Sequence, residues 1–199
     1  MMKLCIQHIV AIGILTLGLT ASVKAQTEKG NMMIGGSADI SESIQNTTSN
    51  FNFSIAPSFG AFVINNLGIG GLYSLSVGSS RVLNSNESHT TTTTFNTQVG
   101  PFVKYYFGKK QMKPFVTGNA GYTVFTQIRS VSTSTSSSLT NYDGFTMGAS
   151  AGIAYFLNPH LSLQSALYVN TSGYQTQIPT TRFGFSLGLY AFLDKKKPE

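Results

Sequence analysis

Cysteine is nearly absent from this sequence: Cys5 is the only one among 199 residues. It lies in an N-terminal segment built like a secretory signal peptide, with Lys3 as the positive region, an apolar core at 9–19 and a small-residue cleavage site ending at Ala25. That core is too short to span a membrane as a helix. Cleavage after Ala25 leaves a chain without any thiol, which excludes a disulfide framework, a cysteine metal site and a cysteine nucleophile.

Charged residues are also scarce, at 10% of the chain against about 25% in soluble domains. The hydrophobic share is an ordinary 41%. Once Lys3 and Lys24 leave with the signal peptide, 11 of the 13 Lys and Arg residues remain against 7 Asp and Glu, a net charge of +4. The lysines cluster near 109–113 and at 195–197 and form no stripe, so we expect no nucleic-acid partner. Few charges with modest hydropathy fit a protein whose strands turn one face to lipid.

Long hydrophobic runs are missing as well, since nothing after the signal peptide approaches the ~20 apolar residues of a membrane helix. The sequence instead alternates with a period of two, which predicts β-strands. In the last such segment, Phe183, Phe185 and Leu187 alternate with Gly184 and Ser186. Eight segments of this kind follow one another, at 31–41, 50–64, 67–78, 93–107, 114–129, 144–157, 160–171 and 182–193.

The connections between these segments alternate in length. Three are short and built from turn-forming residues, at 65–66, 108–113 and 158–159. Four are longer and rich in Ser, Thr and Asn, at 42–49, 79–92, 130–143 and 172–179. Short turns at one end and long polar loops at the other are typical of outer-membrane barrels, whose short turns face the periplasm. An even number of strands places both termini on that periplasmic side.

A soluble barrel also has eight up-and-down strands, so the direction of the apolar face separates the two alternatives. The face of each segment that lies opposite the apolar one is mostly Gly, Ser, Thr, Asn and Gln. This composition suits a packed or hydrated barrel interior better than a water-facing surface. Eight faces like that of the segment 50–64, with Phe51, Phe53 and Phe59, are too much for the interior of one small barrel. The sequence therefore predicts an all-β fold, an eight-stranded antiparallel up-and-down transmembrane β-barrel.

The resulting organisation is a signal peptide at 1–25, one outer-membrane barrel at 26–193 and a basic periplasmic tail at 194–199. We expect the last strand to pair with the first near Met32–Ile40, which closes the barrel and leaves no sheet edge in the membrane. On the last strand, the apolar residues at odd positions from 183 to 189 should face lipid. Tyr190 and Phe192 should fill the periplasmic end of the lumen.

The signal peptide, the eight alternating segments and the aromatic-rich last strand together resemble the small outer-membrane β-barrel family, the OmpA/OmpX-type or "porin family" barrel domain. The resemblance extends over essentially the whole mature chain. It implies a place in the cell outer membrane, contact with outer-membrane lipid, and insertion by the barrel-assembly machinery. Members of that family usually end on an aromatic residue that this machinery reads, whereas here Asp194–Glu199 follow the last strand.

Two groups of residues have the composition of a hydrolase site. His160 and Ser162 share one face of a strand, but no carboxylate is placed by local spacing to orient the histidine. Glu87, Ser88 and His89 are neighbours in a polar loop, which gives them no preorganised geometry. The two histidines of the mature chain are far apart in sequence, and no metal-ligand cluster is visible. We therefore expect no enzymatic activity, no catalytic or metal-binding residues and no cofactor.

The charged side chains that we expect in the lumen are Asp39, Lys104, Arg129 and Arg182. An unpaired charge in a narrow interior is costly, so these residues should be paired or should meet water near the mouths of the barrel.

Two functions remain open. One is a structural or surface-interaction barrel that displays the loops 79–92 and 130–143 to an extracellular ligand. The hydroxyl-rich stretch 130–141 has the β bias to extend two strands beyond the membrane as an exposed edge. The alternative is a narrow channel or carrier for a small or hydrophobic molecule, although eight-stranded barrels ordinarily close on their own side chains.

Overall fold

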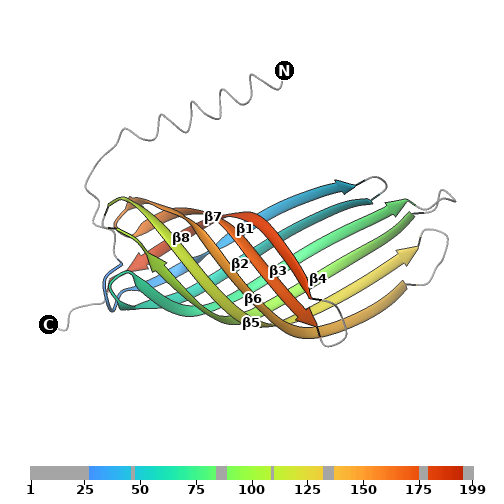
Figure 1. Ribbon diagram of the computed structural model, residues 1–199, viewed down its shortest axis with the longest axis horizontal. Coiled ribbons are helices and arrows are strands. Elements are labelled where there is room, and N and C mark those ends of the chain that lie inside the picture. Colours follow the sequence, from blue (N-terminus) through green and yellow to red (C-terminus); the bar gives the residue numbers. More distant parts are fainter. Residues whose placement is uncertain are drawn as a thin grey trace, which may run out of the picture.

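The computed structural model describes residues 27–45, 48–83, 89–108, 110–131, 137–174 and 179–194. Within them the chain forms eight β-strands, each antiparallel to the next. The eighth strand pairs with the first, so the sheet is a closed barrel (Figure 1). The fold predicted from the sequence is confirmed. No helix in the described part of the chain is long and apolar enough to cross a membrane.

The strands are β1 (Met32–Gln45), β2 (Thr48–Ile64), β3 (Leu67–Leu83), β4 (His89–Tyr106), β5 (Met112–Val131), β6 (Ser137–Asn158), β7 (Leu161–Tyr174) and β8 (Thr180–Leu193). Short turns join β2 to β3, β4 to β5 and β6 to β7 at one end of the barrel, which we name the turn end. The opposite end is the loop end. The first and last described residues, Thr27 and Asp194, both lie at the turn end (Figure 1).

Side chains alternate between the outside and the inside of the barrel because successive residues of a strand point to opposite faces. On β8, Phe183 is 79% exposed and Phe185 is 53% exposed, whereas Tyr190 and Phe192 are buried inside, as the sequence predicts. Large apolar side chains are exposed on all eight strands. A water-soluble monomer rarely carries so much apolar surface, and lipid is the environment that suits it.

Closure between β1 and β8 is confirmed, but it covers only the turn-end half of these strands. Their register runs from Met32 opposite Leu193 to Ala38 opposite Leu187. Beyond that point β1 continues to Gln45 and pairs with β2, while the loop-end half of β8 pairs with β7. Between Ala38 and the loop end, the described residues of β1 and β8 therefore do not pair with each other, and we name this gap the seam.

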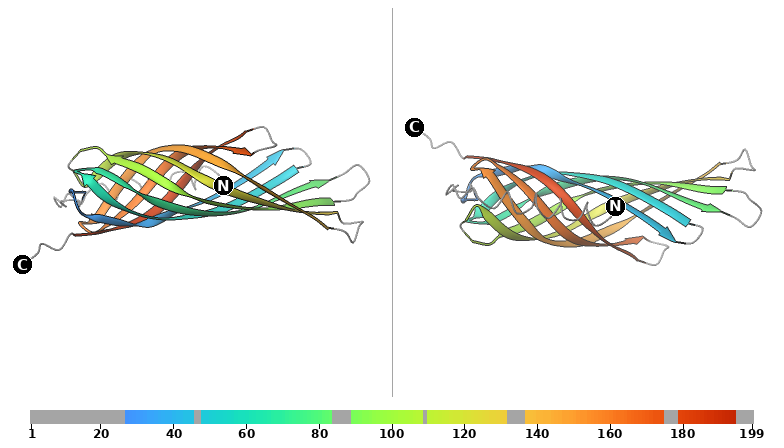
Figure 2. Two further views of the ribbon diagram at one scale, coloured as in Figure 1. Left: turned by 90° about the horizontal axis from the view of Figure 1, so that it is seen from below. Right: turned by 90° about the horizontal axis from the view of Figure 1, so that it is seen from above.

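The four long loops are predicted wrongly in their extent, because most of their residues belong to strands. β5 continues to Val131 and β6 begins at Ser137, so they form a hairpin well beyond the segments recognised by alternation. Both views in Figure 2 show β3 to β6 reaching farther at the loop end than β7 and β8. Ser and Thr pair well in strands, yet with polar residues on both faces the apolar alternation disappears from the sequence.

The turn end is closed by the segment that precedes β1. The backbone of this segment bonds to the β2–β3 turn, where Asn66 donates its amide N–H to the Thr27 carbonyl over 2.7 Å. Gly30 likewise donates to the Phe62 carbonyl over 2.8 Å. Asn66 has a φ of 68°, a left-handed conformation that asparagine tolerates in tight turns. Residues 27–31 thus form a strap across the turn end, and Thr27 is only 2% exposed.

Candidate functional site

The lumen is filled near the turn end by a cluster of apolar side chains, here named the aromatic plug: Met33, Phe62, Tyr106, Phe156 and Phe192, each at most 2% exposed. They come from five different strands and meet on the barrel axis. Ring centres of Phe156 and Phe192 lie 5.0 Å apart, and those of Phe62 and Phe192 lie 6.1 Å apart. The side chains of this layer thus pack against one another inside the barrel.

Glycine on the inner face makes room for the plug. A β-carbon at Gly68 would lie 2.7 Å from the Met33 methyl, and one at Gly60 would lie 3.1 Å from both Met33 and Phe102. The strands thus alternate very small and very large inward residues, which is how a narrow barrel fills its interior.

A lysine lies on the turn-end side of the plug. Lys113 donates from Nζ to Thr27 Oγ1 over 2.6 Å and to Asn66 Oδ1 over 3.2 Å. Its ammonium also lies 5.7 Å from the centre of the Phe156 ring. The strap is therefore tied to the barrel wall by a cation as well as by its backbone.

A second lysine, Lys104, lies on the other side of the plug and is 4% exposed. Its Nζ donates to Gln164 Oε1 over 2.6 Å. The ammonium also lies 4.0 Å from the centre of the Tyr190 ring and 4.4 Å from that of Phe115. Both distances are in the range of a cation–π interaction, so aromatic faces and one amide surround this charge.

Gln164 is held in place by two further bonds. Its Nε2 donates to Tyr106 Oη over 2.9 Å and to Ser162 Oγ over 3.0 Å. With both N–H groups engaged, the amide oxygen is left to face Lys104. These bonds form a fixed polar network on the loop-end side of the plug.

A cavity of about 200 Å³ lies in the lumen between this network and the loop end. Its wall is mostly Ser, Asn, Gln and Thr, with Lys104, Phe115 and Tyr190 among its lining residues at the plug side. Asp39 and Arg182 line it farther from the plug. The cavity is therefore polar along its sides and carries a buried cation at its floor.

Asp39 is held at the seam between β1 and β8. It accepts hydrogen bonds from Ser54 Oγ and, over 3.1 Å, from the hydroxyl of Tyr168. Tyr168 belongs to β7 and reaches β1 across β8 because it passes over Gly184, where a β-carbon would collide with its ring. This bond links the two sides of the seam where backbone pairing has ended.

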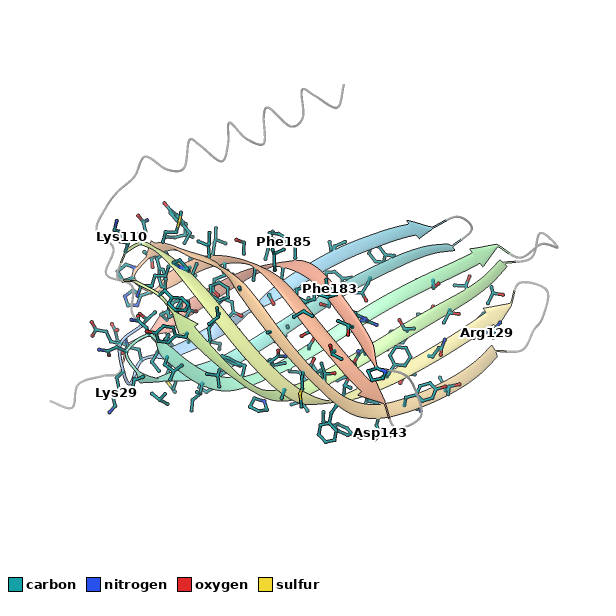
Figure 3. All side chains as sticks on the ribbon, in the orientation of Figure 1. Lys29, Lys110, Arg129, Asp143, Phe183 and Phe185 are labelled. Atoms are coloured by element: carbon teal, nitrogen blue, oxygen red, sulfur yellow. The ribbon has the colours of Figure 1, made fainter. Side chains whose placement is uncertain are left out.

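Three of the four charged residues expected in the lumen line the cavity, and the fourth does not. Asp39, Lys104 and Arg182 line the cavity, and the first two are hydrogen-bonded. Arg129 is exposed near the loop end (Figure 3) and is not among the lining residues. Lys29 and Lys110, in the same figure, mark the opposite end of the molecule.

The partners of Lys104 are the part of this site that sequence reasoning missed. Alternation places Lys104 and Tyr106 on the inner face of β4, and Ser162 and Gln164 on that of β7. It does not indicate which inner faces touch across the lumen. The strand count offers one signal, since β4 and β8 lie opposite each other in an eight-stranded barrel, which would have matched Lys104 to Tyr190.

The family of the chain follows from its sequence as well. A family model described as "Outer membrane protein beta-barrel domain" matches residues 11–192. The chain belongs to this family. Like other outer membrane protein beta-barrel domains, it resides in the outer membrane. Among curated proteins, none is significantly similar to it in sequence.

Three solved structures resemble this outer membrane protein beta-barrel domain. The outer membrane protein OprG from Pseudomonas aeruginosa has a TM-score of 0.53 at 12% identity, over 87% of this chain and 100% of its own. A major outer membrane protein from Thermus thermophilus has a TM-score of 0.49 at 12% identity, over 83% and 100%. Neisserial surface protein A has 0.45 at 17% identity, over 81% and 94%. The likeness to OprG bears on the fold alone.

Of the two hydrolase-like groups, the structure describes the side chains of only His160 and Ser162, and each has another hydrogen-bond partner. His160 Nδ1 is hydrogen-bonded to the Phe192 carbonyl over 3.1 Å, while Ser162 accepts from Gln164. Glu87 and Ser88 lie outside the described residues, as does the side chain of His89. No group of three His, Cys, Asp or Glu side chains among the described residues is arranged to hold a metal ion.

Proposed function

We propose that this protein is a non-conducting surface-interaction barrel, which presents its extended loop-end strands outside the cell and engages another macromolecule there. In this orientation the turn end, with both chain ends, faces the periplasm, as short turns do in outer-membrane barrels. The aromatic plug supports a closed lumen. We further propose that the protein is not an enzyme, because His160 and Ser162 have other hydrogen-bond partners.

The observation that carries the interaction is a strand edge on β6 that has no strand partner in the described part of the chain. Residues 137–143 pair with β5 from Ser130 to Val124. Pairing of β6 with β7 begins at Gly144, opposite Tyr174. The other edge of 137–143 therefore has no strand partner among the described residues. Free backbone N–H and C=O groups on such an edge are a template for adding an extended segment of a partner protein.

The side chains of this edge also favour a water-exposed, protein-binding role. Among residues 139–143, Thr140, Asn141 and Asp143 are polar, and Asp143 accepts a hydrogen bond from Tyr122 over 3.1 Å. Leu139 is 64% exposed at one end of this stretch. An apolar anchor flanked by polar groups is a common composition for an interface.

The test is a matched pair of shortened proteins. Deleting 124–143 and joining Thr123 to Gly144 through Asn-Gly removes the free edge of β6, because these two residues are opposite each other in the register. The control deletes 80–92 and joins Ser79 to Thr93, which are also opposite, through Asn-Gly. It shortens strands in which residues 80–82 and 90–92 are paired on both sides. Both variants should keep the heat-modifiable gel mobility of a closed barrel.

Adhesion of cells that express each protein is then measured on immobilised extracellular-matrix proteins and on cultured cells. The first deletion should reduce adhesion to the level of cells without the protein, and the control deletion should retain it. Unchanged adhesion after the first deletion contradicts the proposal.

A further inference from the structure

We infer that the floor of the lumen cavity binds the charged group of a small organic monoanion, with Lys104 as its counter-ion. This site is separate from the strand edge of β6 and does not depend on it. The inference begins with the charge balance around Lys104. Its ammonium has three N–H donors, yet Gln164 is its one hydrogen-bond acceptor among the described residues. No described carboxylate forms an ion pair with it.

A buried cation without a counter-ion is costly, and aromatic faces compensate for only part of that cost. Lys104 is on the wall of the cavity, so an anion there would meet an ammonium that is already stripped of most of its water. Electrostatic attraction is strong in such surroundings because little solvent screens it.

The side chains that form this site are held in place by other side chains of the lumen. Gln164 cannot turn its N–H groups toward an incoming anion, because Tyr106 and Ser162 hold both of them. The Lys104 ammonium is fixed in turn by the Gln164 oxygen and by the faces of Phe115 and Tyr190. Binding would therefore require little reorganisation of the protein, a feature that binding sites depend on.

Size, shape and charge limit the ligand. A cavity of about 200 Å³ is smaller than the roughly 300–1,000 Å³ of pockets for drug-sized molecules. The rings of Phe115 and Tyr190 offer apolar contact beside the ammonium, so an apolar body next to the anionic group fits. Asp39 and Arg182 both line the cavity and carry opposite charges, so Lys104 leaves one positive charge for the ligand to match. A monocarboxylate about the size of benzoate meets these conditions.

The experiment compares benzoate with benzyl alcohol, a neutral molecule of similar size and shape. The full barrel is refolded in detergent micelles, and binding is measured by ligand-observed NMR and isothermal titration calorimetry in a buffer free of competing carboxylates. Benzoate should bind to the wild-type protein at least tenfold more tightly than benzyl alcohol, as expected for a charge-assisted contact. This comparison needs no variant.

Two variants locate the site. Lys104→Met keeps the length of the side chain and removes its charge, so benzoate should lose its advantage over benzyl alcohol. Ala56→Phe, at a lining position on β2, leaves every charge in place but fills the cavity, so both molecules should lose binding. Heat-modifiable mobility shows that each variant is folded. Equal binding of the two molecules to wild-type protein, no binding of benzoate, or unchanged benzoate binding by Lys104→Met would each overturn the inference.

Discussion

A single residue type has opposite roles on the two faces of this barrel. Phe185 and Phe192 belong to the same strand, but odd and even positions point to opposite faces. Phe185 is 53% exposed on the lipid side, and Phe192 is fully buried in the aromatic plug. Parity of position, rather than hydrophobicity, decides where each ring lies, and it is readable directly from the sequence.

Replacing Phe192 with alanine should destabilise the barrel strongly. Its ring packs against Phe62, Tyr106 and Phe156, and its loss leaves a cavity that the surrounding wall cannot close. We expect a loss of about 3–5 kcal/mol in the free energy of unfolding. Phe185→Ala is the matched control, and its cost should be no more than about 1.5–3 kcal/mol because detergent or lipid fills the vacated space. Urea titration in micelles, followed by circular dichroism, measures both, and equal losses would contradict this account.

The contacts within the polar network cannot be predicted from the alternation of inward and outward positions alone. Lys104 is predictable as an inward residue, but its acceptor Gln164 is 60 positions away on a strand that is not its neighbour in the sheet. Contacts across a lumen depend on strand tilt and register, which set which levels of two strands meet. Neither quantity is visible in the alternation of one strand.

At the scale of the elements, strand identity is predictable and strand length is not. All eight predicted segments lie within strands or overlap them, because lipid imposes strict alternation over the membrane-spanning part. Beyond the membrane-spanning part, the hairpin of β5 and β6 faces water on both sides. Its sequence therefore carries no apolar alternation, although the backbone pairing continues. The seam between β1 and β8 was not predictable either, because the alternation of each strand continues beside it and does not show where their pairing ends.

The hydrogen bond from Tyr168 to Asp39 is the element-scale feature that we expect to stabilise the seam. Tyr168→Phe removes only the hydroxyl and leaves the Asp39 carboxylate with one donor fewer. The barrel should lose about 1.5–3 kcal/mol, the range for a bond to a charged group. Tyr73→Phe is the control, since Tyr73 is 42% exposed on the outer face of β3 and should be nearly neutral. Equal unfolding midpoints for Tyr168→Phe and wild type would show that the bond contributes nothing.

At the scale of the whole molecule, the barrel has one layer of its lumen filled by the aromatic plug. The plug spans the lumen, with Lys104 on one side and Lys113 on the other, and the strap at 27–31 lies beneath it. Composition and alternation predicted an eight-stranded barrel correctly, but whether its lumen is open depended on how five inward side chains meet.

Bilayer conductance tests this closure. Purified protein in planar lipid bilayers should give no discrete, reproducible single-channel steps, because an ion crossing the plug would lose its hydration among aromatic rings. A general porin, measured in the same membranes, provides the positive control. Reproducible steps from the wild-type protein would favour the channel alternative instead.

The short pairing between β1 and β8 has a consequence for the order in which the barrel assembles and comes apart. It joins Met32 to Leu193, on the two strands farthest apart in sequence, so it closes the largest loop in the chain. Loop closure costs entropy, and here the fewest backbone pairs of any neighbouring strands offset it. We therefore expect this junction to be the last to form and the first to release. Opening this junction leaves the other seven strand pairings intact as a curved, open sheet. We therefore expect the barrel to close, and to open again, between β1 and β8.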